Sequence, residues 1–203
     1  MQLDDSCLAL DTLPTPLQPP AQQARTRLNE ALTQADNIAS MSGQELPSEN
    51  WAGLSTERWA ALLRVISIST FALDTLARTP DVLFELDTAG ELDATPERDT
   101  QTSWLAERLN EAEDEAAMHS VIRRFRRARM LGIVWRDLNR PAGYSMWDTA
   151  AAVTTLAEIC LEAALGWMEA FLAPRWGYPA QRADGSEQRL VVLGMGKLGA
   201  GEL

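Results

Sequence analysis

Apolar residues recur at every third or fourth position through most of the first 173 residues of the chain. This spacing places them on one side of an α-helix, so it predicts helices that each bury a stripe. One stripe runs from Ala21 to Ala39, and a second runs from about Thr56 to Ala77 after a loop at residues 43–50. Because nothing in this part has the pattern of paired strands, we expect a helical bundle over residues 21–173.

Prolines mark the boundaries of the expected helices. Four of them fall within the first twenty residues, which predicts a disordered, extended leader at residues 1–20. Further on, Thr79-Pro80-Asp81 and Thr95-Pro96-Glu97 each combine a capping hydroxyl, a proline suited to the first helical position and an acid for the first turn. We expect a helix to begin at each, with Gly90 between them as a stop.

An arginine-rich helix is predicted from about Ala116 to Asn139. At 100° per residue, one of its faces is basic and the opposite face is apolar. Arg129 falls on the apolar side, where a buried guanidinium is expected to meet a carboxylate. The basic face has two interpretations. It is either a docking surface for an acidic partner or a nucleotide, or a solvated face that forms surface ion pairs with the acids at 111–115. It is formed by Arg123, Arg124, Arg126 and Arg127.

The last long helix is predicted to open at Ser145, because the S-x-x-D spelling that ends at Asp148 is typical of a capping box. Its apolar stripe continues for about 27 residues to Leu172, roughly 40 Å of helix, and Pro174 is expected to stop it. The chain has 7 tryptophans. We expect those in the bundle to pack in its core.

Composition and charge exclude several classes of protein. The 203 residues carry 18 Lys and Arg against 29 Asp and Glu, a net charge of −11, whereas a duplex-binding domain normally has the opposite sign. No stretch approaches the ~20 consecutive apolar residues of a membrane span, and the acidic N-terminus does not look like a secretory signal. We therefore expect a cytoplasmic protein that binds neither nucleic acid nor membrane.

Histidine and cysteine are too scarce for the common metal and nucleophile sites. Cys7 and Cys160 stand far apart in the sequence, so they predict neither a metal cluster nor a disulfide framework. His119 is the single histidine, which argues against a zinc site or a catalytic triad. We expect His119 to be a packed or surface residue and Cys160 to behave as a small hydrophobic residue.

The pattern changes after Pro174. Turn-forming residues come first, and the aliphatic run Leu190–Leu193 then predicts a short buried strand. Four glycines follow within eight positions, and Lys197, the only lysine of the chain, lies among them. A loop without Cβ atoms can bring backbone N–H groups against an anion such as phosphate, and a lysine can neutralise its charge.

The candidate phosphate-binding residues are therefore Gly194, Gly196, Lys197 and Gly199. The alternative is a strand-to-helix turn that merely needs glycine. The Walker A spelling fails, because Val191 stands where its first glycine belongs and Leu198 follows the lysine. The dinucleotide fingerprint G-x-G-x-x-G does match, and so does the strand, glycine-rich turn and basic residue of a nucleotidyltransferase.

The full spelling of this region resembles one family. Residues 175–179 read Arg-Trp-Gly-Tyr-Pro, and residues 193–203 read Leu-Gly-Met-Gly-Lys-Leu-Gly-x-x-Glu-Leu. Together they are similar to the N-terminal half of the glutamine synthetase adenylyltransferase/adenylyl-removing enzymes. The arginine-rich helix at 125–138 also resembles the same region of that family. The whole resemblance extends from about residue 55 to residue 203.

The resemblance implies a long cytoplasmic protein with two nucleotidyltransferase domains of the polymerase-β type and a helical regulatory region between them. The C-terminal domain would move AMP from ATP to a tyrosine of glutamine synthetase, and the N-terminal domain would remove it by phosphorolysis, giving ADP. Mg²⁺ is the implied cofactor, with ATP, ADP and phosphate as substrates and glutamine synthetase and PII signal proteins as partners. The implied fold is mainly α, with the first strand and glycine-rich loop of an α/β nucleotidyltransferase domain at residues 174–203.

In this family the loop is soon followed by an S-D-x-D motif whose carboxylates bind the metal ions, and that motif is expected beyond Leu203. We therefore expect no catalytic residue and no metal ligand within this chain, and an N-terminal fragment that is inactive alone. Met195 also stands where the polymerase-β superfamily often has serine.

Two other interpretations stay open. A dinucleotide-binding oxidoreductase cut short at its fingerprint would share the glycine spelling and would place an acid at the end of its second strand. A non-enzymatic helical adaptor would bind its partner through the basic face of the arginine-rich helix.

Overall fold

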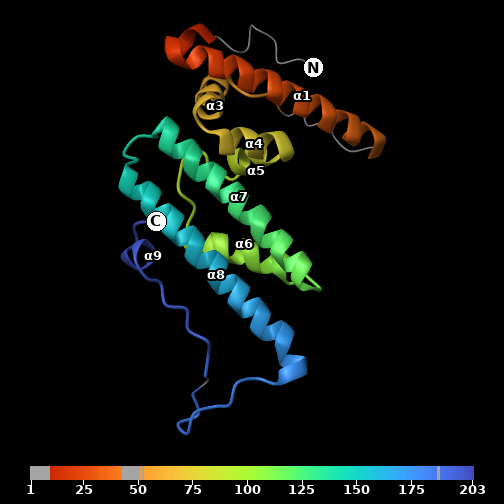
Figure 1. Cartoon of the computed structure of the whole chain (residues 1–203), viewed down its shortest axis with the longest axis vertical. Coiled ribbons are helices and arrows are strands. Elements are labelled where there is room, and N and C mark those ends of the chain that lie inside the picture. The colour runs from red at the N-terminus through yellow and green to blue at the C-terminus, as the bar shows by residue number, and fades with distance from the viewer. Residues whose placement is uncertain (1–9, 43–50, 52, 187) are drawn as a thin grey trace. The chain divides into compact units, whose positions relative to one another are not determined.

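The computed structural model describes residues 10–42, 51, 53–186 and 188–203 and shows a succession of helices (Figure 1). Two 3₁₀ turns come first, and eight labelled α-helices follow within the described residues. Their bounds are Leu10–Thr12 and Thr15–Leu17 for the turns, then α1 Gln18–Ser42, α3 Thr56–Ile68, α4 Thr70–Arg78, α5 Val82–Thr88, α6 Arg98–Leu109, α7 Glu115–Asn139, α8 Met146–Trp176 and α9 Lys197–Ala200. The prediction of a mainly helical protein is confirmed.

The chain divides into two compact units. The first contains the residues through Thr95 together with Met130–Ser145, and the second contains Pro96–Arg129 together with Met146–Leu203. Helix α7 supplies residues to both units. The domain boundary predicted between residues 173 and 174 stays a prediction.

The core of the first unit is built where α1, α3 and α4 pack on one another. Leu28 of α1 and Leu62 of α3 are fully buried, as their apolar stripes predicted. Trp51 is also fully buried, and its ring centroid lies 5.8 Å from those of both Trp59 and Phe84. This aromatic cluster holds the start of α3 against α5.

The expectation that tryptophans pack in the core is only partly right. Trp51, Trp59 and Trp135 are buried, but Trp147 is 65% exposed, and Trp176, which lies beyond the predicted bundle, is 72% exposed. These two lie at opposite ends of α8, which has 31 residues, whereas its packing partner α6 has 12. A helix of 12 residues spans less than half the length of α8, so it leaves the ends of α8 uncovered.

The single helix predicted over residues 56–77 is wrong, because the chain breaks at Ser69. The Ser69 hydroxyl accepts a hydrogen bond from the backbone N–H of Ala72 at 3.2 Å and so caps α4, while the Ser69 N–H closes α3 on Val65. The two helices meet at a bend of 115°. In the described part of the chain no single helix is long and apolar enough to cross a membrane; this bent pair meets those criteria only when its two halves are taken together.

Residues 10–20 differ from the disordered leader predicted for residues 1–20, whose first nine positions lie outside the described residues. They form the two 3₁₀ turns and the first turn of α1. Prolines are tolerated there because the first N–H groups of a helix have no partner within it. The Gln18 side-chain amide donates to the Leu13 carbonyl at 3.1 Å, which ties this segment to α1.

The helices predicted at the two Thr-Pro pairs do form, but each begins two residues later. The N-caps are Asp81 and Glu97, and neither makes a side-chain capping bond. The Val82 N–H instead bonds to the Thr79 carbonyl, so the Thr-Pro pair forms a turn ahead of α5. Gly90 has a φ of +72° after the end of α5, which confirms it as the stop.

Helix α8 begins at Met146, directly after the predicted capping serine, but its predicted end is wrong. It continues through Pro174 to Trp176. Gly177 then takes a φ of +80° and its N–H bonds to the Ala173 carbonyl at 2.8 Å. A proline in the last turn removes one hydrogen bond without ending the helix, and the left-handed glycine supplies the actual C-terminus.

The strand predicted at Leu190–Leu193 does not form, and its side chains are exposed rather than buried. The exposed fractions are 68% for Leu190, 73% for Val191, 52% for Val192 and 81% for Leu193. The described residues contain no other extended segment that pairs with it, and a lone strand has no partner for its backbone groups. The helical part of the predicted fold is therefore confirmed, and the nucleotidyltransferase sheet stays a prediction.

Helix α7 shows the two faces that its sequence predicted. The four arginines at 123, 124, 126 and 127 are exposed, while Phe125 and Ala128 are buried. Arg129 lies 5.3 Å from the ring centroids of both Trp104 and Phe125, so an aromatic contact accompanies its position on the apolar side.

Arg136 is a buried cation of the first unit that the hydrophobic pattern did not predict. It is 2% exposed, donates from Nη1 to the Glu91 carbonyl, and lies 5.9 Å from the ring of Tyr144. Gly132 makes room for it: a Cβ at this glycine would meet Arg136 Nη1 at 3.2 Å.

We predict that Gly132→Ala destabilises the protein by ~1–2 kcal/mol, because the buried Arg136 side chain would have to give up its place. Gly166→Ala is the matched control, since this glycine also lies inside a long helix but a Cβ there meets nothing within 4 Å. The control should gain roughly 0.5–1 kcal/mol. Urea unfolding measures both, and equal gains would contradict this account of Gly132.

Arg58 joins α3 to the turn after α5 through two carboxylates. Its guanidinium donates to both carboxylate oxygens of Asp93, at 2.9 and 2.5 Å, and lies 2.8 Å from Asp87. The hydrogen bond from Arg58 lowers the pKa of Asp93. A carboxyl whose pKa is lower in the folded state stabilises the protein above its unfolded pKa, about 3.9, and loses that effect as the pH falls.

We predict that Asp93→Asn costs ~0.5–1 kcal/mol at pH 7, a value kept small because Asp93 is largely exposed. The difference from the unsubstituted protein should shrink below pH ~4 and vanish once Asp93 is protonated. Urea unfolding at pH 7, 4 and 3 tests this. A difference that stays constant over the three pH values would show that the ion pair is not its cause.

Candidate functional site

The glycine-rich loop closes on itself through a contact that only glycine permits. A Cβ at Gly199 would lie 2.5 Å from the Gly194 carbonyl oxygen and 3.1 Å from its carbonyl carbon. A side chain at this position would therefore force the backbone apart. Gly196 caps α9 with a φ of +60°, and Gly201 ends α9 with a φ of +72°. The structure thus brings Gly194 and Gly199 together as the two sides of one tight turn.

Lys197 is the first residue of α9 and is exposed. Its carbonyl accepts a hydrogen bond from the Glu202 N–H at 2.8 Å, and the Gly196 carbonyl accepts one from Ala200 at 3.0 Å. These bonds fix the backbone around the lysine and leave its ammonium group in solvent. The predicted phosphate-binding residues are therefore contiguous, although the strand expected before them is absent from the described structure.

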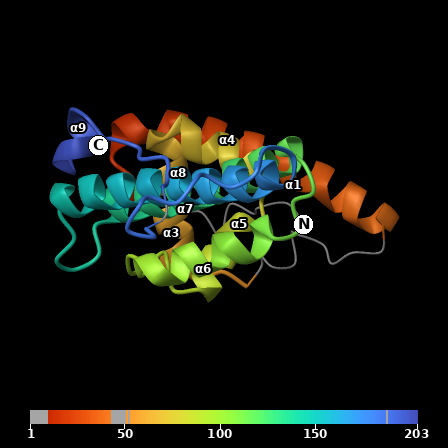
Figure 2. The same ribbon diagram turned by 90° about the horizontal axis from the view of Figure 1, so that it is seen from below.

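The loop is attached to the N-terminal part of α8. After α8 the described residues run back along the helix, so that α9 lies near its first turns (Figures 1 and 2). The Leu203 N–H donates to the hydroxyl oxygen of Thr154 at 3.2 Å, and that hydroxyl donates to the Ala150 carbonyl at 2.9 Å. Thr154 is buried, so this bond gives the end of the loop a fixed place on the helix.

The turn at residues 182–186 confirms the turn chemistry predicted there. The Ser186 N–H and hydroxyl both donate to one carboxylate oxygen of Asp184, at 2.9 and 2.6 Å. The hydrogen bond from the Ser186 side chain, followed by that from its backbone, lowers the pKa of Asp184. Gly185 has a φ of +83°, so the segment reverses direction before it reaches the loop.

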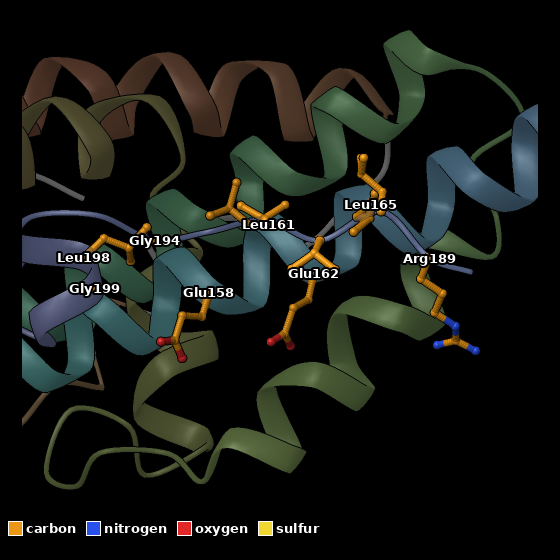
Figure 3. A pocket seen from close by; sticks show the side chains of 11 residues that line it. Glu158, Leu161, Glu162, Leu165, Arg189, Gly194, Leu198 and Gly199 are labelled. Carbon is orange, nitrogen blue, oxygen red and sulfur yellow. The ribbon is translucent and has the colours of Figure 1, made fainter. Parts of the chain in front are cut away.

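A cavity of about 600 Å³ lies between α8 and the returning segment (Figure 3). From α8 it is lined by Glu158, Leu161, Glu162 and Leu165, and from the segment by residues 189–192, Gly194, Leu198 and Gly199. Lys197 and Gly196 do not line it. A smaller cavity of about 460 Å³ lies further along the segment, beside Tyr178 and Gln188.

The carboxylates at the larger cavity are already engaged. Arg98 of α6 donates to Glu158 at 2.5 Å and to Glu162 at 2.9 Å, and Figure 3 shows both carboxylates on the same side of α8. The hydrogen bond to Glu158 raises the pKa of Arg98, and the bond to Glu162 adds to the effect. Arg189 lines the same cavity from the returning segment, so two guanidinium groups stand against the two carboxylates and the cavity carries no clear excess of either charge.

The described residues do not fit a magnesium ion. Among them, no three His, Cys, Asp or Glu side chains converge as metal ligands, and the two carboxylates that line the larger cavity bind Arg98. We derive no chemical step through a metal from this part of the chain.

His119 and Cys160 are the isolated residues of the sequence that the structure describes. His119 is exposed on α7, and Cys160 is half-buried on α8. Burial raises the pKa of the Cys160 thiol, against an opposing effect of Arg126. A raised pKa makes the thiolate scarcer, as in a structural cysteine. Cys7 lies outside the described residues.

Sequence reasoning missed the pairing of the Arg98 guanidinium with the carboxylates of Glu158 and Glu162. The two glutamates stand at i and i+4, which puts them on one face of α8, and that spacing was the available signal. Their partner, however, lies 60 and 64 positions earlier in the chain, where no local pattern identifies it.

Comparison with known proteins identifies the family. A sequence model of the glutamate-ammonia ligase adenylyltransferase family matches residues 59–203. A bifunctional glutamine synthetase adenylyltransferase/adenylyl-removing enzyme of Pseudomonas aeruginosa is 35% identical over 195 residues, which is 96% of this chain but 19% of that protein. A protein of the same name from Thioalkalivibrio sulfidiphilus is 40% identical over 152 residues, covering 74% of this chain and 15% of that protein. The resemblance found in the glycine-rich loop is confirmed, and the chain belongs to the glutamate-ammonia ligase adenylyltransferase family.

Proposed function

We propose that this chain is the N-terminal part of a longer cytoplasmic enzyme that adenylylates and deadenylylates glutamine synthetase. The relatives that carry this name are about five times as long as the matched region. The family match includes the loop at 194–199, so it favours a nucleotidyltransferase over the dinucleotide-binding oxidoreductase. PII signal proteins are the proposed regulators, by family resemblance.

The observation that carries the proposal is the contact between Gly199 and the Gly194 carbonyl. It builds a tight turn without side chains beside the exposed ammonium group of Lys197. Backbone N–H groups in such a turn can approach phosphate oxygens, and the ammonium group can neutralise part of their charge. Lys197 is exposed and does not line the cavity beside α8, so we propose that nucleotide phosphates bind on the side of Lys197 rather than in that cavity.

The proposed reactions balance as transfers of an adenylyl group. In adenylylation, a tyrosine oxygen of glutamine synthetase attacks the α-phosphorus of ATP, the bond to the β-phosphate oxygen breaks, and pyrophosphate leaves while the phenol proton passes to a base. In deadenylylation, a phosphate oxygen attacks the same phosphorus, the bond to tyrosine breaks, the tyrosine oxygen takes up a proton and ADP forms. The loop's part is to hold and orient phosphate oxygens. Mg²⁺ would supply charge neutralisation in the longer enzyme.

We predict that the complete enzyme transfers label from α-³²P-ATP to glutamine synthetase and releases labelled ADP when phosphate is added. The 203-residue chain alone should transfer none, because its described residues bring no group of carboxylates together that suits the metal. Incorporation of label into the purified synthetase measures the first reaction. A complete enzyme that never labels the synthetase would overturn the proposed function.

We predict that Gly199→Ala in the complete enzyme lowers kcat/KM for deadenylylation by ~100-fold, the scale of losing a positioned backbone donor. Ala200→Ser is the control, since it changes the neighbouring exposed residue of α9. Thermal unfolding should be nearly unchanged in both variants, because the loop is exposed. If Gly199→Ala retained full activity, the loop contact would have no role in phosphate binding.

A further inference from the structure

The basic face of α7 is strongly charged and exposed, and the proposed chemistry leaves it without a role. Arg123, Arg126 and Arg127 are all exposed. No described carboxylate lies within 4 Å of any of the three, whereas Arg27, Arg58 and Arg98 form ion pairs elsewhere. We call these three residues the arginine stripe. Arg124 is exposed beside them.

The arginine stripe concentrates positive charge in an acidic chain. Arg126 and Arg127 stand three and four positions after Arg123, so the side chain of Arg123 neighbours both of them on the helix surface. Like charges at these spacings repel one another and weaken a helix, and the whole chain carries a net charge of −11. The acids at 111–115, which the sequence suggested as ion-pair partners of this face, make no ion pair with the stripe in the described structure. The three arginines of the stripe therefore lack the ion pairs that the solvated-face interpretation offered them.

Packing on the opposite side fixes the direction of the stripe. Phe125 is fully buried, and its ring centroid lies 5.5 Å from that of Trp104 on α6. Arg129 adds a contact to both rings. Because this aromatic contact holds the rotation of α7, the arginines are presented on a rigid surface, which reduces the entropy lost when a partner binds.

The chemistry of the stripe selects the kind of partner. None of the large exposed hydrophobic residues lies on α7, every residue of which is described, so the face is not suited to an apolar groove or to insertion into a membrane. The net negative charge of the chain disfavours nucleic acid. What complements three guanidinium groups at helical spacing is a protein surface with carboxylates at a similar spacing.

We propose that the arginine stripe is a docking surface for an acidic protein surface, and that its occupant is glutamine synthetase. The choice of occupant rests on the proposed function. The stripe would hold the synthetase through charge-assisted hydrogen bonds and speed its association, while the chemistry takes place at the nucleotide site of the complete enzyme. Association of this kind is faster at low salt and slows as salt screens the charges.

Binding of the 203-residue chain to immobilised glutamine synthetase, measured by biolayer interferometry at 50 and 300 mM NaCl, tests the proposal. The triple variant Arg123→Glu, Arg126→Glu and Arg127→Glu should bind at least ~10-fold more weakly at 50 mM, and the salt dependence should largely disappear. The control variant reverses Arg78, Arg175 and Arg182, which are also exposed but far apart in the sequence. It makes the same change in net charge and should bind as the unsubstituted chain does.

A second variant keeps the test valid if charge reversal disturbs folding. Arg123→Gln, Arg126→Gln and Arg127→Gln removes repulsion along α7, so circular dichroism should show an intact helix while binding still weakens. Equal binding by the stripe and control variants would overturn the proposal. So would failure of the unsubstituted chain to bind at 50 mM NaCl, or tighter binding to a single-stranded oligonucleotide than to the synthetase.

The complete enzyme separates this proposal from the proposed function. If it labels glutamine synthetase and the stripe variant raises KM for the synthetase without changing kcat, both stand. If the complete enzyme labels the synthetase but the stripe variant has the same KM for the synthetase as the unsubstituted enzyme, the docking proposal fails and the proposed function stands. If it never labels the synthetase, the function fails, and binding to the chain then decides the docking proposal by itself.

Discussion

The close approach of Gly199 to the carbonyl oxygen of Gly194 is the constraint on which the functional account depends. At 2.5 Å from a would-be Cβ, this contact restricts one position of the loop to glycine and sets how sharply the backbone turns. Everything proposed for Lys197 follows from that turn, because it decides where the ammonium group stands relative to the backbone N–H groups. A looser turn would leave a lysine on a coil, with no defined place for a phosphate.

Helix α8 is the scaffold that gives this turn its surroundings. Its Thr154 hydroxyl receives the Leu203 N–H, and its Glu158 and Glu162 carboxylates bind Arg98 of α6. The same helix therefore joins the packing of the second unit to the loop. It also supplies the carboxylates of the cavity beside α8, which are engaged by Arg98 and share the lining with Arg189, whereas Lys197 stands outside that cavity.

The parts of the fold that a local pattern determines could be predicted from the sequence. The two faces of α7 follow from the alternation of arginines with Phe125 and Ala128, and Gly90 ends its helix as a left-handed glycine should. The break at Ser69 could not be seen, because the apolar stripe continues across it and only the hydroxyl bond to Ala72 decides the outcome. The end of α8 was predicted from Pro174, but the helix tolerates a proline in its last turn and ends at the left-handed Gly177.

The site was predictable only in part, for a physical reason. Glycines and a lysine identify a loop from sequence because their effect is local, whereas a strand at Leu190–Leu193 requires partners that lie elsewhere. The pairing of Arg98 with α8 and the burial of Arg136 beside Gly132 depend on residues tens of positions away. Such contacts depend on how the helices pack, so they cannot be predicted from hydrophobic periodicity.

The most direct test uses the fact that the chain contains a single lysine. Selective ¹⁵N-lysine labelling gives one backbone amide signal, that of Lys197, which can be followed by NMR while pyrophosphate is added at low salt. We predict that this signal shifts in a saturable way, and that in a second, uniformly ¹⁵N-labelled sample the glycine amides of the loop shift with the same dissociation constant. If the Lys197 signal stays in place while pyrophosphate moves signals elsewhere in the chain, the glycine-rich loop is not the phosphate site.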